Sequence, residues 1–224
     1  MMIDRLNSIH SQIRAAAENA GRTPDSVLLL AVSKTKSAQA ITEAYQAGQR
    51  HFGENYVQEA LAKQQELSAF AVTWHFIGPI QSNKTRLIAE HFDWVHSVDS
   101  LKIAQRLSSQ RPAHLAALNI CLQVNISDET SKSGIGLEDL AELCAQVGQL
   151  PHLRLRGVMA IPAPESQFER QRQPYQRLYR AVKQLPTAAD LDTFSFGMSG
   201  DLAAAIMEGA TIVRIGTALF GARS

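Results

Sequence analysis

The sequence lacks the features that mark secreted, membrane-bound or disulfide-stabilised proteins. It has only two cysteines in 224 residues, which predicts no disulfide framework and a reducing compartment. No apolar run approaches the roughly 18 residues that a bilayer-spanning helix needs. The N-terminus has no basic patch followed by an apolar segment, so a secretory signal is not expected. These absences predict a soluble, cytoplasmic protein that has no membrane partner.

An excess of one charge and a metal-binding spacing are also missing. The 22 Lys and Arg residues nearly balance the 21 Asp and Glu residues, and no block of roughly five or more like charges occurs. Nucleic acid is therefore not an expected partner. The seven histidines are scattered without a pair spaced to hold one metal ion, and we expect no metal site. Cys121 and Cys144 fall in a predicted strand and a predicted helix, where we expect them to be buried apolar residues.

The chain instead alternates short apolar runs with helical patterns. Segment 3–20 repeats apolar residues at helical spacing, and Gly21 is expected to end this opening helix. Eight short apolar segments bounded by turn residues are predicted strands: 27–32, 51–53, 74–78, 94–98, 118–125, 155–160, 193–197 and 211–216. Predicted helices separate them: 38–47, segments that begin at 57, 84, 101 and 137, and then 166–185 and 201–207.

Eight strands that alternate with helices predict an α/β fold with a parallel sheet and right-handed crossovers. The length suits a single (β/α)8 TIM barrel domain over residues 1–224, with an extra N-terminal helix. An open, doubly wound sheet is the alternative. That fold favours a glycine-rich turn after the first strand, and residues 33–37 contain no glycine.

Lys34 directly follows the first predicted strand. Active sites of such barrels lie at the carboxyl ends of the strands, which makes Lys34 a candidate on geometry alone. Apolar barrel walls favour the uncharged amine, the nucleophile that forms a Schiff base. On position alone, a surface lysine in an ordinary loop is the alternative. Lys36, Lys84 and Lys132 are other candidate amines, and Lys132 belongs to a long polar loop that is a candidate flap.

Two segments near the C-terminus predict a phosphate site. Residues 197–201 offer the Ser199 hydroxyl and unhindered backbone N–H groups at the start of a short helix. Gly216 and Thr217 offer the same combination after the last strand, and barrels commonly bind phosphate with the loops after strands seven and eight. An ordinary helix cap or turn is the alternative for each segment. Together with Lys34, the two segments predict a phosphate-bearing aldehyde as ligand.

Arg214 lies two residues before Gly216, so strand alternation turns both to the same side of the sheet. A guanidinium inside a barrel needs a partner, which we expect to be the pyridine nitrogen of a cofactor. A structural salt bridge with a carboxylate is the alternative. Asn55 ends the second strand and is expected either to contact the cofactor ring or to cap the next helix. Segment 75–84 and Met159 are less specific candidates at the third and sixth strand ends.

Five short strings occur in order at the spacing of a barrel: AVSKTK at 31–36, FGENYVQE at 52–59, HFIGPIQSNK at 75–84, GMS at 197–199 and VRIGT at 213–217. With these strings the chain resembles, over essentially its whole length, the pyridoxal 5′-phosphate homeostasis protein family, related in fold to the N-terminal barrel of alanine racemase. The resemblance implies that pyridoxal 5′-phosphate is the cofactor, held as a Schiff base on Lys34, with its phosphate on Ser199, Gly216 and Thr217. It also implies that the protein binds, buffers and delivers this cofactor, with apo-enzymes that need it as partners.

The alternatives to such a carrier are enzymes. An amino-acid racemase needs a second base, which alanine racemase takes from a second domain. The sequence ends seven residues after Thr217, so we expect no such domain and no catalytic residue. A barrel enzyme that forms a Schiff base between Lys34 and a sugar phosphate is another alternative. Our leading hypothesis is a non-catalytic, monomeric carrier of pyridoxal 5′-phosphate in vitamin B6 homeostasis, with the binding residues Lys34, Asn55, Ser199, Arg214, Gly216 and Thr217.

Overall fold

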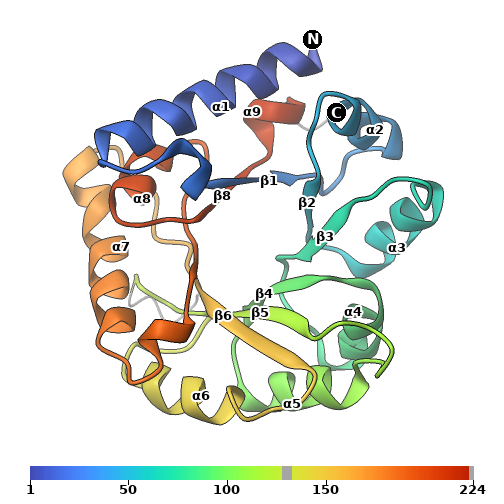
Figure 1. The fold of residues 1–224 in the computed structure, drawn as a ribbon, viewed down its shortest axis with the longest axis vertical. Coiled ribbons are helices and arrows are strands. Elements are labelled where there is room, and N and C mark those ends of the chain that lie inside the picture. The colour runs from blue at the N-terminus through green and yellow to red at the C-terminus, as the bar shows by residue number, and fades with distance from the viewer. Residues whose placement is uncertain (128–132, 222–224) are drawn as a thin grey trace.

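Eight parallel strands form a closed ring in the computed structural model, which describes residues 1–127 and 133–221 (Figure 1). Each strand pairs with its sequence neighbours, and β1 pairs with β8 to close the ring. The strands are β1 (Leu28–Val32), β2 (His51–Glu54), β3 (Thr73–Phe76), β4 (Trp94–Val98), β5 (Leu118–Gln123), β6 (Leu153–Met159), β7 (Thr193–Ser195) and β8 (Ile212–Ile215). The predicted barrel is confirmed, and the open doubly wound sheet is wrong.

Helices surround the ring of strands (Figure 1). Those in the described residues are α1 (Met2–Asn19), α2 (Ala38–Gln46), α3 (Val57–Glu66), α4 (Thr85–His91), α5 (Leu101–Gln110), α6 (Leu140–Val147), α7 (Phe168–Lys183), α8 (Leu202–Met207) and α9 (Thr217–Phe220). The extra helix α1 packs against α8 and α9, outside the seam between β1 and β8. It buries Leu6, Ile9 and Ile13, as the spacing predicts, whereas Ile3 is exposed.

The strand β1 shows how a continuous apolar run serves two buried faces. Leu29 and Ala31 belong to the hydrophobic core between the strands and the helices. Leu30 alternates to the other side, at the level of Arg214 in the β1–β8 register. A Cβ on Gly53 would meet Ile77 at 3.1 Å and Leu30 at 3.3 Å, so side chains fill the barrel interior there.

Most predicted element boundaries agree with the structure to within a few residues. The predicted seventh strand runs too far, because Gly197 turns the chain with a φ of 86°, which ends β7 at Ser195. The helix α6 begins at Leu140, later than predicted, and α9 is not predicted at all. The opening helix, β1 and β4 agree closely with their predicted ranges.

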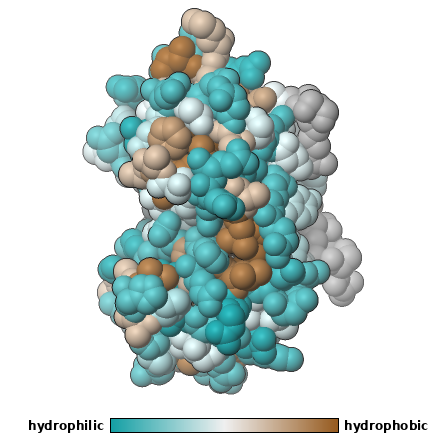
Figure 2. Space-filling view, turned by 90° about the vertical axis from the view of Figure 1, so that its right-hand side faces the viewer, coloured by the Kyte–Doolittle hydropathy of each residue, from teal (hydrophilic) through white to brown (hydrophobic). Residues whose placement is uncertain are grey.

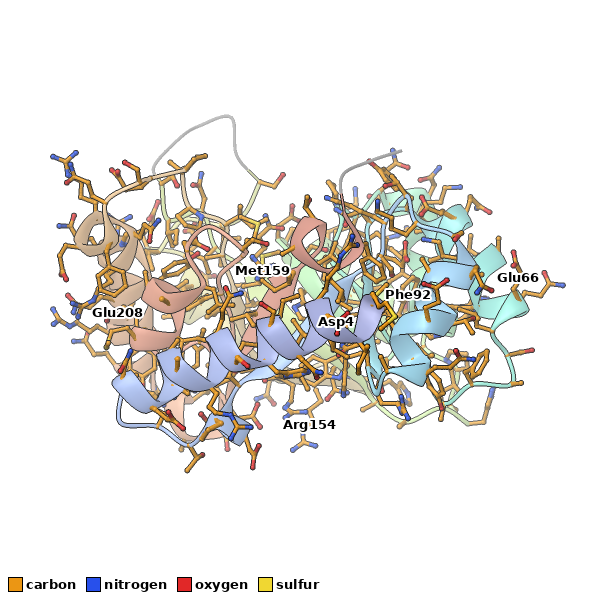
Figure 3. All side chains as sticks on the ribbon, turned by 90° about the horizontal axis from the view of Figure 1, so that it is seen from above. Asp4, Glu66, Phe92, Arg154, Met159 and Glu208 are labelled. Atoms are coloured by element: carbon orange, nitrogen blue, oxygen red, sulfur yellow. The ribbon has the colours of Figure 1, made fainter. Side chains whose placement is uncertain are left out.

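Because the strands are parallel, their carboxyl ends lie at one mouth of the barrel, here called the carboxyl-terminal mouth; the other is the amino-terminal mouth. In Figure 3, Arg154 near the start of β6 lies at the lower edge, and Met159 at its end lies higher. The carboxyl-terminal mouth therefore faces upward in that view. Figure 2 shows that the side of the molecule that carries α3 is mostly hydrophilic, with separate hydrophobic patches. No helix in the described residues is long and apolar enough to cross a membrane.

Candidate functional site

Lys34 lies at the carboxyl-terminal mouth, just beyond the end of β1, and is half-buried. The next residue, Thr35, has a φ of 63°, and its backbone N–H donates to Glu59 at 2.6 Å. Left-handed backbone is rare for a β-branched residue and costs roughly 1–2 kcal/mol. Strain of this kind persists where surrounding contacts hold it, and it is typical of functional sites. The turn therefore favours a functional role for Lys34 over an ordinary surface loop.

A buried network of charged groups holds the Lys34 turn from α3 and β2. Lys63 donates from Nζ to the Ser33 carbonyl at 2.8 Å, to Glu54 Oε1 at 2.8 Å and to Glu59 Oε1 at 2.5 Å. Ser33 donates its hydroxyl to Glu54 Oε1 at 2.5 Å. These bonds fix the backbone immediately before Lys34, and one ammonium group joins three acceptors in doing so.

Glu54 is the buried acceptor of that network. Burial raises the pKa of its carboxyl group, and the neighbouring Lys63 ammonium and Ser33 hydroxyl oppose this rise. Its second oxygen, Oε2, is buried and has no hydrogen-bond partner among the described residues. Removal of Lys63 would therefore leave a carboxyl group without compensation in the protein interior.

Arg214 is buried and reaches from β8 towards the ends of β7 and β6. Its Nη1 donates to the carbonyl and the hydroxyl of Ser195, the latter at 2.8 Å, and its Nη2 donates to the Ala160 carbonyl at 3.0 Å. Within the described residues no carboxylate pairs with Arg214, contrary to the salt-bridge alternative, and its Nε has no partner. Burial lowers the pKa of Arg214, and the more distant Tyr175 and Asp201 oppose this.

Asp201 shapes the loop that follows β7. Its Oδ1 accepts the Met198 backbone N–H at 2.7 Å, and its Oδ2 accepts the Tyr175 hydroxyl at 2.7 Å. Burial and then the Asp201 charge raise the pKa of Tyr175 well above its ordinary value. Ser199 is exposed on this loop, and the backbone N–H groups of Ser199 and Gly200 have no partner in the described part of the chain. The loop offers a hydroxyl and two free donors, which suits an anion.

The turn after β8 leads directly into α9 and lies against the end of β1. Gly216 is the N-cap of α9, and a Cβ there would lie 3.3 Å from the Val32 carbonyl oxygen. Thr217 is exposed at the first helical position, where backbone N–H groups have no intrahelical acceptor. Because β1 pairs with β8, this turn and the Lys34 turn are neighbours at one mouth.

Asn55 follows β2 at the same mouth, and its amide oxygen is buried without a hydrogen-bond partner among the described residues. It does not cap the next helix, because Tyr56 occupies the N-cap position of α3 and no side chain caps that helix. A Cβ on Gly78 would lie 2.2 Å from the Asn55 carbonyl oxygen, so the two backbones touch. A cavity of about 330 Å³ lies beside Asn55 and is also lined by Tyr56 and Lys84. A buried acceptor without a partner is a group that a ligand can satisfy.

The other candidates from the sequence have different surroundings. Met159 is buried at the end of β6. Lys36 is half-buried in the same turn as Lys34, and Lys84 is half-buried just before α4. Lys132, with the candidate flap around it, lies outside the described residues.

The cysteines are buried and unpaired, as predicted for apolar core residues. Burial raises the pKa of the Cys121 thiol to about 12 and that of Cys144 to about 11, which keeps both protonated at neutral pH. Within residues 1–127 and 133–221, no three His, Cys, Asp or Glu side chains are arranged to hold a metal ion.

Two polar groups of the structure were not predicted from the sequence. The first is the pairing of Glu54 with Lys63, for which a charged residue at the end of an apolar strand was the available signal. The second is a row of three hydrogen-bonded histidines, His51, His75 and His96. Their signal was one histidine in each of three consecutive predicted strands, which a search for metal-binding spacing overlooks.

Known proteins share this arrangement of elements. The family described as alanine racemase, N-terminal domain, matches residues 5–224. The chain belongs to this family. The pyridoxal phosphate homeostasis protein of Pseudomonas aeruginosa is 62% identical over 220 residues, which cover 98% of this chain and 95% of that protein. The protein of the same name from Escherichia coli K12 is 58% identical over 222 residues, with coverages of 97% and 95%.

A solved structure resembles the chain over its full length. PipY of Synechococcus elongatus, solved with PLP bound, is 41% identical and superimposes with a TM-score of 0.86, covering 99% of this chain and 100% of that one. The structure of PipY without PLP gives a TM-score of 0.88. The similarity thus includes every strand of the barrel.

Proposed function

We propose that this protein binds pyridoxal 5′-phosphate at the carboxyl-terminal mouth and serves in the intracellular homeostasis of that cofactor, without catalytic turnover. The observation that carries the proposal is the pairing of β1 with β8, which sets the strained Lys34 turn beside Gly216 and Thr217. A nucleophilic amine then lies next to an anion site. The relatives support the proposal, since two are named for pyridoxal phosphate homeostasis and PipY has PLP bound.

The aldehyde and the phosphate of the cofactor each have partners in the proposed site. Lys34 would hold the aldehyde of the cofactor through its amine, as a Schiff base formed with loss of one water molecule. Ser199 and Thr217 hold the phosphate through their hydroxyls and neighbouring backbone N–H groups, and Gly216 lets the backbone approach closely. The free N–H groups of Ser199 and Gly200 support this assignment.

Arg214 and Asn55 are proposed to contact the ring of the cofactor. The Nε of Arg214 and the buried amide oxygen of Asn55 both lack partners among the described residues, so each is available to a ligand. A guanidinium only donates hydrogen bonds, so a ring nitrogen bound to Arg214 stays unprotonated. An unprotonated ring is a weak electron sink, which suits storage of the cofactor better than chemistry on amino acids.

The experiment that tests this proposal is the absorption spectrum of the purified protein after addition of pyridoxal 5′-phosphate. We expect a visible Schiff-base band that disappears in Lys34→Ala, and covalent attachment at Lys34 after borohydride reduction. Lys36→Ala is the matched control, because Lys36 is half-buried in the same turn, and it should keep the band.

Two results would contradict the proposal. A protein that shows no band even with excess cofactor would remove pyridoxal 5′-phosphate as ligand. Exchange of the α-proton of both enantiomers of an amino acid into heavy water, at ordinary enzyme rates, would contradict the non-catalytic role. Delivery to apo-enzymes, action as a monomer and a cytoplasmic location stay predictions alongside it.

A further inference from the structure

A continuous row of hydrogen bonds crosses the barrel interior from the amino-terminal mouth to Arg214. His51 Nδ1 lies 3.0 Å from His75 Nε2, and His75 Nδ1 lies 2.9 Å from His96 Nε2. His96 Nδ1 lies 2.8 Å from Ser195 Oγ, and this oxygen accepts a hydrogen bond from Arg214 Nη1 at 2.8 Å. The three histidines come from β2, β3 and β4, so neighbouring strands supply one ring each. We call these three histidines and Ser195 the histidine chain.

The hydrogen bonds of the histidine chain have one direction, which Arg214 sets. A guanidinium can only donate, so Ser195 Oγ accepts from Arg214. His96 Nδ1 is the other side-chain neighbour of that hydroxyl in the described residues, so the hydroxyl proton makes a hydrogen bond only when it points to His96. His96 Nδ1 is then an acceptor, and in a neutral ring the proton lies on Nε2.

The same reasoning passes from ring to ring. His96 Nε2–H donates to His75 Nδ1, so His75 also carries its proton on Nε2 and donates to His51 Nδ1. His51 is half-buried and lines an open cavity of about 290 Å³ at the amino-terminal mouth, where its own Nε2–H can meet water. Every lone pair in the chain therefore faces towards Arg214, and every N–H faces away from it.

The surroundings keep these rings neutral. Burial lowers the pKa of His75 well below its ordinary value, and burial followed by the Arg214 charge lowers the pKa of His96 to about 3. Trp94 stacks on His75 with ring centroids 5.5 Å apart, which closes one side of the chain with an apolar surface. Burial also lowers the pKa of His51, although Asp93 opposes this.

We propose that His51, His75 and His96 are positioning residues for Arg214: through Ser195 they form a chain of Nε2–H tautomers whose aligned dipoles take the place of a counter-ion. Arg214 is a buried cation that no carboxylate contacts in the described residues; two carbonyls and the more distant Asp201 compensate part of its charge, and the rest needs a further source. A row of oriented neutral dipoles supplies it without a bidentate carboxylate, which would occupy the remaining guanidinium N–H groups. The link to cofactor binding rests on the proposed function; the tautomers do not.

The tautomers are measured by two-bond ¹⁵N–¹H correlation spectra of the protein with ¹⁵N-labelled histidine, first without cofactor. We expect His75 and His96 each to give the pattern of one neutral Nε2–H tautomer. Arg214→Met should convert both to mixtures, because Ser195 can then accept from His96 as well as donate to it. Arg154→Met is the matched control, since Arg154 is exposed near the amino-terminal mouth, and it should leave both patterns unchanged (Figure 3).

Ser195→Ala removes the hydroxyl that connects His96 to Arg214 and keeps Arg214 in place. We expect mixed tautomers at His96 and about a tenfold loss of affinity for pyridoxal 5′-phosphate, the size of effect expected when one hydrogen bond to a charged group is lost. Circular dichroism checks that each variant is folded. Wild-type Nδ1–H tautomers, or unchanged tautomers in both Arg214→Met and Ser195→Ala, would overturn the proposal. Correct tautomers in a protein that never binds cofactor would support the chain and contradict only the proposed function.

Discussion

Around Arg156 at the amino-terminal mouth polar side chains bond to one another, whereas at the carboxyl-terminal mouth some polar groups have no partner in the described residues. Arg156 donates to both carboxylate oxygens of Asp192 at 2.9 and 2.8 Å and to Asn119 at 3.0 Å, and it lies over the ring of Trp94. At the opposite mouth, the Ser199 backbone N–H and the Asn55 amide oxygen lack such bonds.

Apolar side chains follow the same division. Tyr56, Ile161 and Met198 are exposed, and each lies just after β2, β6 or β7 at the carboxyl-terminal mouth.

Two further buried atoms without a partner among the described residues, Gln110 Oε1 and Thr187 Oγ1, lie on the amino-terminal side, at the end of α5 and just after α7. The division is therefore one of degree: bonded groups such as Arg156 contribute stability at one end, and Asn55 and Ser199 at the other end are available to a ligand.

The largest change in stability is expected in the buried network of Lys63 and Glu54. This network is bonded although it lies beside the carboxyl-terminal mouth, so it is an exception to the comparison. Lys63→Met should lower the free energy of unfolding by about 3–5 kcal/mol, because Glu54 then stays buried without its cation. Urea denaturation measures the change, with the exposed Lys102→Met as control. The double variant Glu54→Gln/Lys63→Met should recover most of the loss. A loss below about 1 kcal/mol for Lys63→Met would place this pair with ordinary surface ion pairs.

A smaller effect is expected from acid on the histidine chain. His75 and His96 have lowered pKa values in the folded protein, so the unfolded chain binds protons there that the folded one does not. The stability that they contribute is present above the ordinary pKa of 6.5 and is lost as the pH falls towards their folded values. Each should add about 1.4 kcal/mol per pH unit to the slope of the unfolding free energy below about pH 6. His96→Asn should reduce the pH dependence of the unfolding free energy by about 1.4 kcal/mol per pH unit. An unchanged pH dependence would show that His96 is charged in the folded protein.

The smallest changes are expected from a pair of variants, one at each mouth, which tests the comparison directly. Ser199→Ala should weaken binding of pyridoxal 5′-phosphate about tenfold, because the hydrogen bond from the Ser199 hydroxyl to the charged phosphate is lost. It should change the free energy of unfolding by less than about 0.5 kcal/mol. Arg156→Met should do the reverse, with a loss of about 1 kcal/mol in stability and unchanged affinity. Spectroscopic titration and urea denaturation measure the two quantities. Equal effects of both variants on affinity would contradict the division of tasks between the mouths.

The fold was predictable because its signals are local. The apolar run that forms β1 and the helical spacing of α1 are each complete within one segment, and their alternation determines the barrel. Lys34, Gly216 and Thr217 could also be assigned to one mouth, since the carboxyl ends of parallel strands meet there. Whether they bind the cofactor stays a proposal.

Side-chain pairings across the barrel could not be predicted, because they depend on register. Ser195 meets Arg214 and His96 only because β7, β8 and β4 bring them to one level of the interior, which no single segment encodes. From the sequence, a salt bridge was one of the two alternatives for Arg214. In the structure its partners are instead backbone carbonyls and a hydroxyl, which accept its hydrogen bonds. Thr35 likewise shows no sign in the sequence of its left-handed backbone.

The pairing of β1 with β8 also determines at what stage of protein synthesis the proposed site can form. On a ribosome, β1 and the Lys34 turn emerge early, whereas Arg214 and Thr217 are added near the end of translation. The ring cannot close until β8 has docked beside β1, and contacts so distant along the chain form late in folding. A nascent or prematurely terminated chain thus has Lys34 beside β2 but without β8 and the turn at Gly216 and Thr217. The proposed site would therefore be complete only in polypeptides whose synthesis has passed the last strand.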